Sequence, residues 1–436
     1  MQRLIHLLIA FVFLAALVPA QAVHAQPPIP EGCTFRVDST TGEQVLVCQP
    51  LRWNGDLVVF AHGYVPDVPP NSPPIFPWEQ LTVPNSTTTL PGILTGLGYL
   101  FAATSYTQNG LVVVQGIQDI RNLVTSLRAL YPIRRVFLVG ASEGGLITTL
   151  AVEQYPAEFS GGVSVCGPVG DFRAQIQYFG DFRVLFDHYF PVLPALYGGT
   201  PVDIPPALMA DWVASPSPAK LAVLGALSGA PVQSVQDLLK AARAPIDPAD
   251  PVNTTAATTL GLLDYSVLAM MNAQQVLQAQ PYDNTATWYS GTSNDALLNA
   301  TVARYPGAGD IAGALAPYQT SGRLKKPLVT MHTTLDPIVP IWQQTLYRLK
   351  VYSAGSFWKY NGLVVNRYGH CNFKAPELLF GFGLMLVKST FRPVTAEMAR
   401  QILGSDQEVQ DFLQLNREYE DITLPPPQIY LPSIQR

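Results

Sequence analysis

Residues 136–151, VFLVGASEGGLITTLA, change from the pattern of a buried strand to that of a helix within a few positions. The apolar run before Gly140 is typical of a buried strand, and the segment 143–156 has the composition of a helix. Between them, Ser142 stands on a corner made of small residues. Small neighbours let a strand and a helix approach closely, and such a turn lifts the serine hydroxyl clear of the sheet. The pattern G-x-S-x-G therefore predicts a strand, a sharp turn with a strained backbone at Ser142, and a helix.

Strands and helices alternate along the chain on both sides of this turn. The expected strands cover residues 56–63, 98–106, 134–142, 160–167, 325–336 and 362–370, and the expected helices cover residues 116–131, 143–156, 341–350 and 375–389. Alternation of this kind predicts an α/β fold, with a mostly parallel central sheet and helices on both of its faces.

The alternation stops between about residues 171 and 322, where helical segments rich in alanine, leucine and proline take its place. An independent second domain is one explanation. We favour a helical cap insertion, because core strands resume near residue 325. The predicted division of the chain is a first part of the core over 26–170, a cap insertion over 171–322, a second part of the core over 323–392 and a C-terminal extension over 393–436.

Residues 1–25 are predicted to be a cleavable secretory signal peptide. Arg3 precedes an apolar run from Leu4 to Val18, and Val23 and Ala25 stand at the positions that a signal peptidase recognises. A membrane anchor is the alternative, but a run of about 15 apolar residues is short for a span of about 20. We therefore expect a secreted or periplasmic protein that has no stable membrane insertion.

The chain has four cysteines, and export predicts that they form disulfides, because an oxidising compartment favours these bonds. Cys33 and Cys48 flank TFRVDSTTGEQVLV, an alternating segment that turns near Thr41 and predicts a hairpin with the two cysteines opposite each other. That pairing leaves Cys166 for Cys371, with two buried free thiols as the alternative. The sequence contains neither C-x-x-C nor H-E-x-x-H, so no metal site is expected.

The charge of the chain argues against a nucleic-acid partner. The formal net charge is −5 and only 13% of the residues are charged, without basic runs. Binding to nucleic acid requires clustered Lys and Arg. The sequence also lacks a dinucleotide-binding fingerprint, so we expect no cofactor.

A serine nucleophile needs a base, and the base needs an acid that orients it. His370, in RYGHCNF, follows the last expected strand at the edge of the sheet where Ser142 should emerge. Asp336, in TTLDPIVP, follows the next-to-last strand. We interpret His370 as the general base and Asp336 as its orienting acid. Structural roles are expected for the remaining histidines beyond the signal peptide, which are His62, His188 and His332.

The order Ser142, Asp336, His370 and the motifs AHGY, GASEGG, TTLDPIVP and YGHC make the chain similar to the α/β-hydrolase fold superfamily over roughly residues 31–390. The resemblance implies that Ser142 is the nucleophile and that a cap is inserted after the sixth core strand. It also implies an oxyanion hole made by the backbone N–H groups of Tyr64 and Glu143.

Tannase-like members of this superfamily pair a cysteine that follows the catalytic histidine with one beside the nucleophile. This chain resembles them in Cys371, but Ala141 precedes Ser142, so the partner of Cys371 must come from elsewhere. Cys166 is the unassigned cysteine. We predict that a Cys166–Cys371 bond anchors the histidine loop.

A serine at the turn distinguishes the chain from epoxide hydrolases and haloalkane dehalogenases of this fold, which use an aspartate there. We interpret the protein as a carboxylesterase or lipase that acts on a small-molecule or polymeric ester. A serine exopeptidase of the proline-aminopeptidase kind stays open, with Asp181 and Asp187 available to hold a substrate ammonium. A non-catalytic binding module is a third possibility. An apolar substrate pocket, or simply the core of the cap, is suggested by Trp212, Trp288, Met209, Met270 and Met271.

Overall fold

The computed structural model describes residues 29–390, and within them eight strands form a single sheet. The strand order is β1-β2-β4-β3-β5-β6-β7-β8. The strands are β1 (Cys33–Val37), β2 (Gln44–Cys48), β3 (Asp56–Ala61), β4 (Leu100–Thr104), β5 (Arg135–Ala141), β6 (Gly161–Val165), β7 (Leu328–Leu335) and β8 (Tyr360–Tyr368). Strand β2 pairs antiparallel with β1 and with β4, and all other neighbours are parallel. The mostly parallel α/β sheet predicted from the sequence is confirmed.

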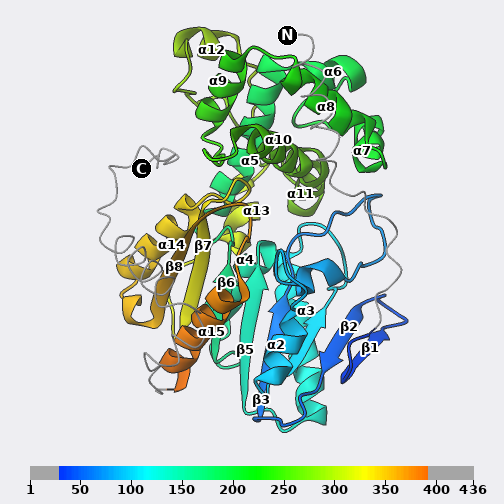
Figure 1. Cartoon of the computed structure of the whole chain (residues 1–436), viewed down its shortest axis with the longest axis vertical. Helices are drawn as coiled ribbons and strands as arrows, with labels where there is room; N and C mark the ends of the chain where they lie inside the picture. The colour runs from blue at the N-terminus through cyan, green and yellow to red at the C-terminus, as the bar shows by residue number, and fades with distance from the viewer. Residues whose placement is uncertain (1–28, 391–436) are drawn as a thin grey trace.

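Helices cover both faces of this sheet. One face carries α3 (Val113–Leu130), α4 (Glu143–Gln154) and α14 (Trp342–Ser353), whose apolar residues join a large buried cluster. The opposite face, toward the viewer in Figure 1, carries α2 (Leu90–Gly96) and α15 (Ala375–Thr390) over a second cluster. Strands β3 and β5 are buried along their central residues because both of their faces are covered, which explains their continuous apolar runs.

A group of helices connects β6 to β7 and gathers at one end of the sheet (Figure 1). Its helices are α5 (Phe172–Tyr189), α6 (Val192–Tyr197), α7 (Pro206–Val213), α8 (Pro218–Ser228), α9 (Val232–Ala242), α10 (Pro251–Asp264), the π-helix η2 (Tyr265–Ala269), α11 (Met270–Leu277), α12 (Asp295–Thr301), α13 (Ile311–Leu315) and η3 (Ala316–Tyr318). Two further short helices, η1 (Trp78–Leu81) and η4 (Phe357–Lys359), lie in loops of the core.

Two of the predicted segments lie outside the described residues, namely the signal peptide over 1–25 and the C-terminal extension over 393–436. The division of the rest into core and cap stays a prediction. Within residues 29–390, no helix combines the length and the apolar character that crossing a bilayer requires.

Both expected disulfides are present. Cys33 and Cys48 are register partners on β1 and β2, so their bond closes the predicted hairpin. Cys166, directly after β6, is bonded to Cys371 in the loop after β8, with Cα atoms 5.4 Å apart. The second bond therefore ties the ends of two strands that are not neighbours in the sheet.

Candidate active site

Ser142 occupies the turn between β5 and α4 in a conformation that side-chain-bearing residues rarely adopt. Its φ is 57° and its ψ is −123°. The Ser142 N–H donates to the Val165 carbonyl at 2.9 Å, and the Ser142 carbonyl accepts from the Gly145 N–H at 2.9 Å. Backbone in such a sparsely populated region persists when its surroundings hold it, and it is common at functional sites.

Two glycines make this turn sterically possible. A Cβ on Gly140 would collide with the backbone of Gly144, because strand and helix approach each other there. A Cβ on Gly144 would collide with the carbonyl of Ala61 at the end of β3. The small residues in this part of the sequence therefore mark a place where the strand and the helix approach each other closely.

Ser142, His370 and Asp336 come together in one hydrogen-bonded chain. The Ser142 hydroxyl lies 2.9 Å from His370 Nε2, to which it donates. On the other side of the ring, His370 Nδ1 lies 2.8 Å from Asp336 Oδ2 and 3.1 Å from Oδ1. Asp336 is fully buried, whereas the His370 side chain retains 20% exposure. The three residues come from the ends of β5, β7 and β8, which meet at one edge of the sheet.

The turn that carries Asp336 is held by its own backbone and by α5. Asp336 Oδ1 accepts from the N–H groups of Ile338 and Val339 at 2.9 and 3.0 Å. The Tyr178 hydroxyl donates to the Pro337 carbonyl at 2.9 Å. Helix α5 therefore helps to fix the carboxylate that faces the histidine.

Two other histidines near the site are buried and bonded to backbone. Burial lowers the pKa of His62 to about 4, and its Nδ1 lies 2.7 Å from the Gly63 carbonyl. The His62 ring stacks on Tyr106 with centroids 4.0 Å apart. Burial also lowers the pKa of His332, whose Nε2 lies 2.7 Å from the Val339 carbonyl. Both rings are thus neutral at pH 7 and support loops, in agreement with the sequence-based expectation.

The loop after β3 brings Tyr64 next to Ser142, and both residues line the same cavities. The Gly63 N–H donates to Gln80 Oε1 at 2.6 Å, while no hydrogen bond to another described residue occupies the N–H of Tyr64 or of Glu143. The Tyr64 hydroxyl donates to the carbonyl of Leu268 in η2 at 3.2 Å. The two N–H groups named from the resemblance are therefore available at the site.

The Glu143 side chain is buried beneath this corner. Its Oε1 accepts from the Val112 N–H at 2.9 Å, and its Oε2 has no partner among the described residues. Burial, only partly offset by that hydrogen bond, raises the pKa of Glu143 to about 8. A neutral carboxyl at pH 7 follows, directly beside Ser142.

Tyr265, the first residue of η2, was not found by sequence reasoning. Burial is the main cause of the raised pKa of Tyr265, and a side-chain hydrogen bond with Ser142 opposes it. No local pattern could have identified this residue, because its place depends on a π-helical turn about 120 residues further along the chain.

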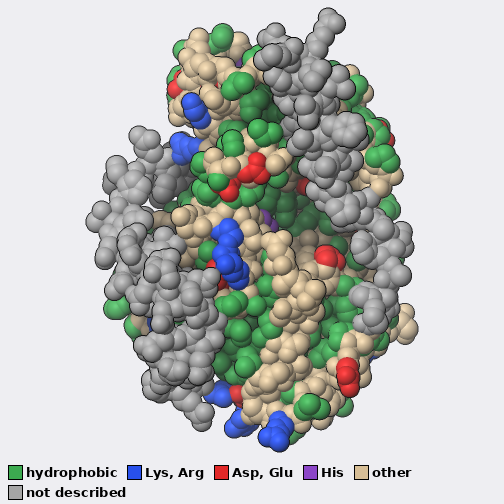
Figure 2. All heavy atoms as spheres, viewed as in Figure 1, with side chains coloured by type: hydrophobic (Ala, Val, Ile, Leu, Met, Phe, Trp, Pro, Cys, Tyr) green, Lys and Arg blue, Asp and Glu red, His purple; other side chains and the backbone are tan. Residues whose placement is uncertain are grey.

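Two cavities border Ser142. Figure 2 shows a hollow between the upper helices and the rest of the described chain. Of the five apolar residues named from the sequence, Met270 lines the smaller cavity. Trp212 is buried within the helical segment and Trp288 is 64% exposed, so neither forms a wall of these cavities. Met209 and Met271 pack against the large buried cluster. Trp212, Met209 and Met271 therefore contribute to the packing of the helical segment.

A possible group of metal ligands also lies at the site. Among the described residues, ligand atoms of Cys166, His370 and Cys371 lie within 4.8 Å of one another. The two sulfur atoms are bonded to each other, so they offer no thiolate to a metal ion. The cluster is explained by the disulfide beside the histidine.

A family model described as "alpha/beta hydrolase fold" matches residues 115–374. No curated protein matches the sequence.

Similar solved structures include the acylaminoacyl peptidase of Pyrococcus horikoshii, at 12% identity and a TM-score of 0.41, covering 85% of this chain and 43% of that one. The chain thus spans less than half of the length of that peptidase. The esterase of Pyrococcus furiosus has 13% identity and a TM-score of 0.41, with 84% and 94% of the two chains covered. A membrane phospholipase A, a bacterial virulence factor, has 13% identity and a TM-score of 0.39, with 89% and 99% covered.

Proposed function

Because the chain belongs to the alpha/beta hydrolase family, we propose that it is a secreted serine hydrolase that cleaves carboxylic esters through an acyl-enzyme. The observation that carries the proposal is the continuous hydrogen-bonded chain from Ser142 through His370 to Asp336. This arrangement activates a serine hydroxyl for attack on a carbonyl carbon, with the carboxylate orienting the ring and stabilising its cation.

In the proposed reaction, Ser142 Oγ forms a bond to the ester carbonyl carbon while its proton passes to His370 Nε2. The negative charge that develops on the carbonyl oxygen is stabilised by the N–H groups of Tyr64 and Glu143, each worth roughly 3–4 kcal/mol. Breaking of the C–O bond then releases the alcohol, which takes the proton from His370. Water then forms a bond to the acyl carbon and gives a proton to His370; the bond from that carbon to Ser142 Oγ breaks, Ser142 takes the proton back from His370 Nε2, and the acid leaves.

The acidic residues of the helical segment support an ester over an aminopeptidase substrate. Asp181 accepts from the hydroxyls of Tyr282 and Tyr289 at 3.0 and 2.7 Å. Asp187 pairs with Arg183 at 2.8 Å. Neither carboxylate borders the cavities at Ser142, so neither is placed to hold a substrate ammonium there.

Export is the second part of the proposal. It rests on the predicted signal peptide and on two disulfides among the described residues, which form and persist in oxidising compartments.

The test is to incubate the protein with p-nitrophenyl esters and with aminoacyl anilides, and to label it with a fluorophosphonate. We expect ester hydrolysis and labelling at Ser142, and no anilide hydrolysis. Ser142→Ala should lower kcat by about 10⁴-fold or more and abolish labelling. Ser228→Ala, at an exposed serine of α8, is the matched control. Labelling that persists in Ser142→Ala, or preferential anilide cleavage, would contradict the proposal.

A further inference from the structure

The two cavities at Ser142 meet at a tyrosine. Three residues line both cavities, namely Tyr64, Ser142 and Tyr265. Ser142 carries the hydroxyl, and Tyr64 lies on the core loop beneath. The remaining shared residue, Tyr265, comes from η2 and stands between the two spaces as a wall.

The ring of Tyr265 is fixed on two sides. It stacks on Phe179 of α5, with centroids 4.7 Å apart and ring planes 6° from parallel. It also packs against the Tyr64 ring at 5.7 Å, and the Tyr64 hydroxyl bonds to the Leu268 carbonyl one turn further along η2. A π-helical turn inside a helix is rare and occurs often at functional sites. The Tyr265 ring is therefore fixed in its position by the residues packed around it.

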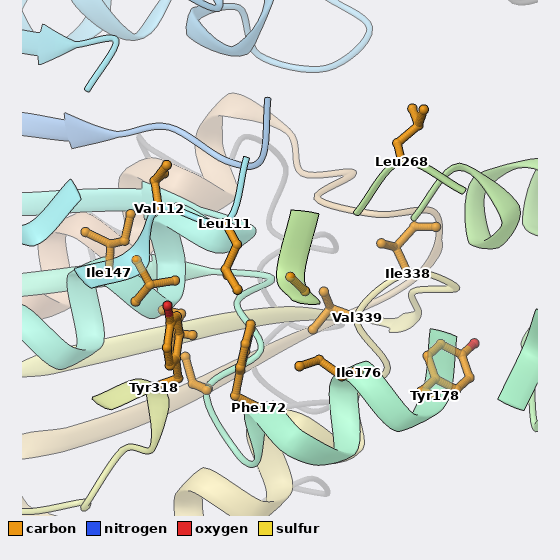
Figure 3. Packing of buried hydrophobic residues seen from close by; sticks show 14 of the residues in the cluster. Leu111, Val112, Ile147, Phe172, Ile176, Tyr178, Leu268, Tyr318, Ile338 and Val339 are labelled. Atoms are coloured by element: carbon orange, nitrogen blue, oxygen red, sulfur yellow. The ribbon is translucent and has the colours of Figure 1, made fainter. Parts of the chain in front are cut away.

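The smaller cavity is lined mostly by large apolar side chains. Leu111, Phe172, Ile176 and Val339 point toward one another around it (Figure 3). Its volume is about 70 Å³. At about 10–15 Å³ for each water-sized group, it has room for roughly five to seven non-hydrogen atoms.

The larger cavity lies on the side of the histidine. Its volume is about 290 Å³, and His370 and Cys371 are in its wall. Glu79, Gln80 and Thr82 add polar groups to its lining. Since the general acid must reach the oxygen of the leaving alcohol, the alcohol belongs in the cavity that contains His370.

We propose that Tyr265 divides the site into a small acyl compartment and a large alcohol compartment, so that the substrate is an ester of a short apolar acid with a bulky alcohol. The proposal rests on the function proposed above, because it takes Ser142 as the nucleophile. Tyr265 is then a specificity-determining residue: its ring, rather than its hydroxyl, sets the length of the acyl group.

The experiment uses two series of esters with the full protein. In the first series p-nitrophenol is constant and the acid grows from acetate to dodecanoate. In the second the acid is acetate and the alcohol grows from methanol to naphthol. We expect kcat/KM to fall by about tenfold or more once the acyl chain exceeds about six carbons. In the second series kcat/KM should not fall as the alcohol grows.

Substitutions of Tyr265 distinguish the effect of its ring from the effect of its hydroxyl. Tyr265→Ala should extend the acyl chains accepted beyond eight carbons, whereas Tyr265→Phe should keep the length profile of the parent protein. Ile176→Ala enlarges the same compartment from the opposite side and serves if Tyr265→Ala does not fold. Tyr305→Ala, at a tyrosine of the same helical segment that borders neither cavity, is the control.

The possible results distinguish failure of the proposed function from failure of the division of the site by Tyr265. Loss of fluorophosphonate labelling at Ser142 in the parent protein would overturn the proposed function together with this inference. Labelling combined with equal rates on butanoate and dodecanoate, or with a size limit in the alcohol series, would overturn the inference alone. So would an unchanged acyl-length profile in both Tyr265→Ala and Ile176→Ala.

Discussion

Replacing Glu143 by glutamine should protect the protein against the loss of stability that this carboxyl causes as the pH rises from 4.5 to about 8. The Glu143 carboxyl is buried with one oxygen bonded to the Val112 N–H and the other without a partner among the described residues. Glutamine has nearly the same shape and keeps an oxygen that can accept from Val112. The change therefore removes an ionisable proton while leaving the packing of the α4 start in place.

The magnitude follows from the raised pKa of Glu143. Burial raises this pKa from 4.5 to about 8, so the folded protein holds a proton that the unfolded chain releases above pH 4.5. The free energy of unfolding therefore falls as the pH rises from 4.5 to about 8, and it is constant with respect to this group above that range. With about 1.4 kcal/mol for each tenfold change in proton affinity, the loss between pH 5 and pH 9 is about 4 kcal/mol.

Urea unfolding at pH 5, 7 and 9, followed by tryptophan fluorescence with both disulfides intact, measures this effect. The difference in unfolding free energy between Glu143→Gln and the parent protein should be small at pH 5 and grow to about 4 kcal/mol at pH 9 in favour of the variant. Glu79→Gln, at an exposed carboxyl, is the control that should track the parent protein at every pH. A difference for Glu143→Gln that is the same at pH 5 and pH 9 would refute the idea that the fold retains this carboxyl in its neutral form.

Three further predictions concern the turn, the acid and the disulfide. Asp336→Asn should leave a folded protein whose kcat for esters is about 10⁴-fold lower, because a neutral amide does not orient the imidazole and stabilise its cation as the carboxylate does. Activity within tenfold of the parent protein would contradict this. The double change Cys166→Ala with Cys371→Ala should lower the free energy of unfolding by roughly 4–5 kcal/mol and lower kcat, and peptide mapping of the unreduced parent protein should show the bond. Gly144→Ala should prevent soluble expression because its methyl group would meet a carbonyl of β3, while Gly225→Ala, in open space on α8, should be tolerated.

Much of the sheet could be predicted because its elements carry their signal locally. Strands β5 and β6 are short apolar runs bounded by glycine and polar residues, and both were expected within two residues of their observed bounds. The start of α4 was recognisable from the small residues around Ser142, although the helix is buried on almost all sides and shows little amphipathic pattern. The short helix α2 was not expected, because a proline at its second residue and two glycines in its seven residues weaken the helical pattern.

The candidate site could be predicted only where chemistry and chain order restrict the choice. Few histidines are present, and His370 is the one that follows the last core strand. Tyr265 could not be found in this way, because it matters only through lining the same cavities as Ser142, a residue more than a hundred positions away. Its neighbour Leu268 bonds to Tyr64 across a separation of 204 residues. Contacts of this kind depend on how the helical segment packs on the core, which no local pattern records.

The helical segment between β6 and β7 takes part in the site through two separate anchors. Tyr178 of α5 bonds to the turn that carries Asp336, and the Leu268 carbonyl of η2 bonds to the loop that carries Tyr64. The candidate catalytic groups come from the ends of core strands, whereas Tyr265 of the helical segment, which stacks on Phe179, borders both cavities. Substitutions in this segment can therefore change which substrates fit without altering the candidate catalytic groups. The same anchors imply that displacing η2 would release the Tyr64 loop, so the wall and the proposed oxyanion hole depend on one packed arrangement.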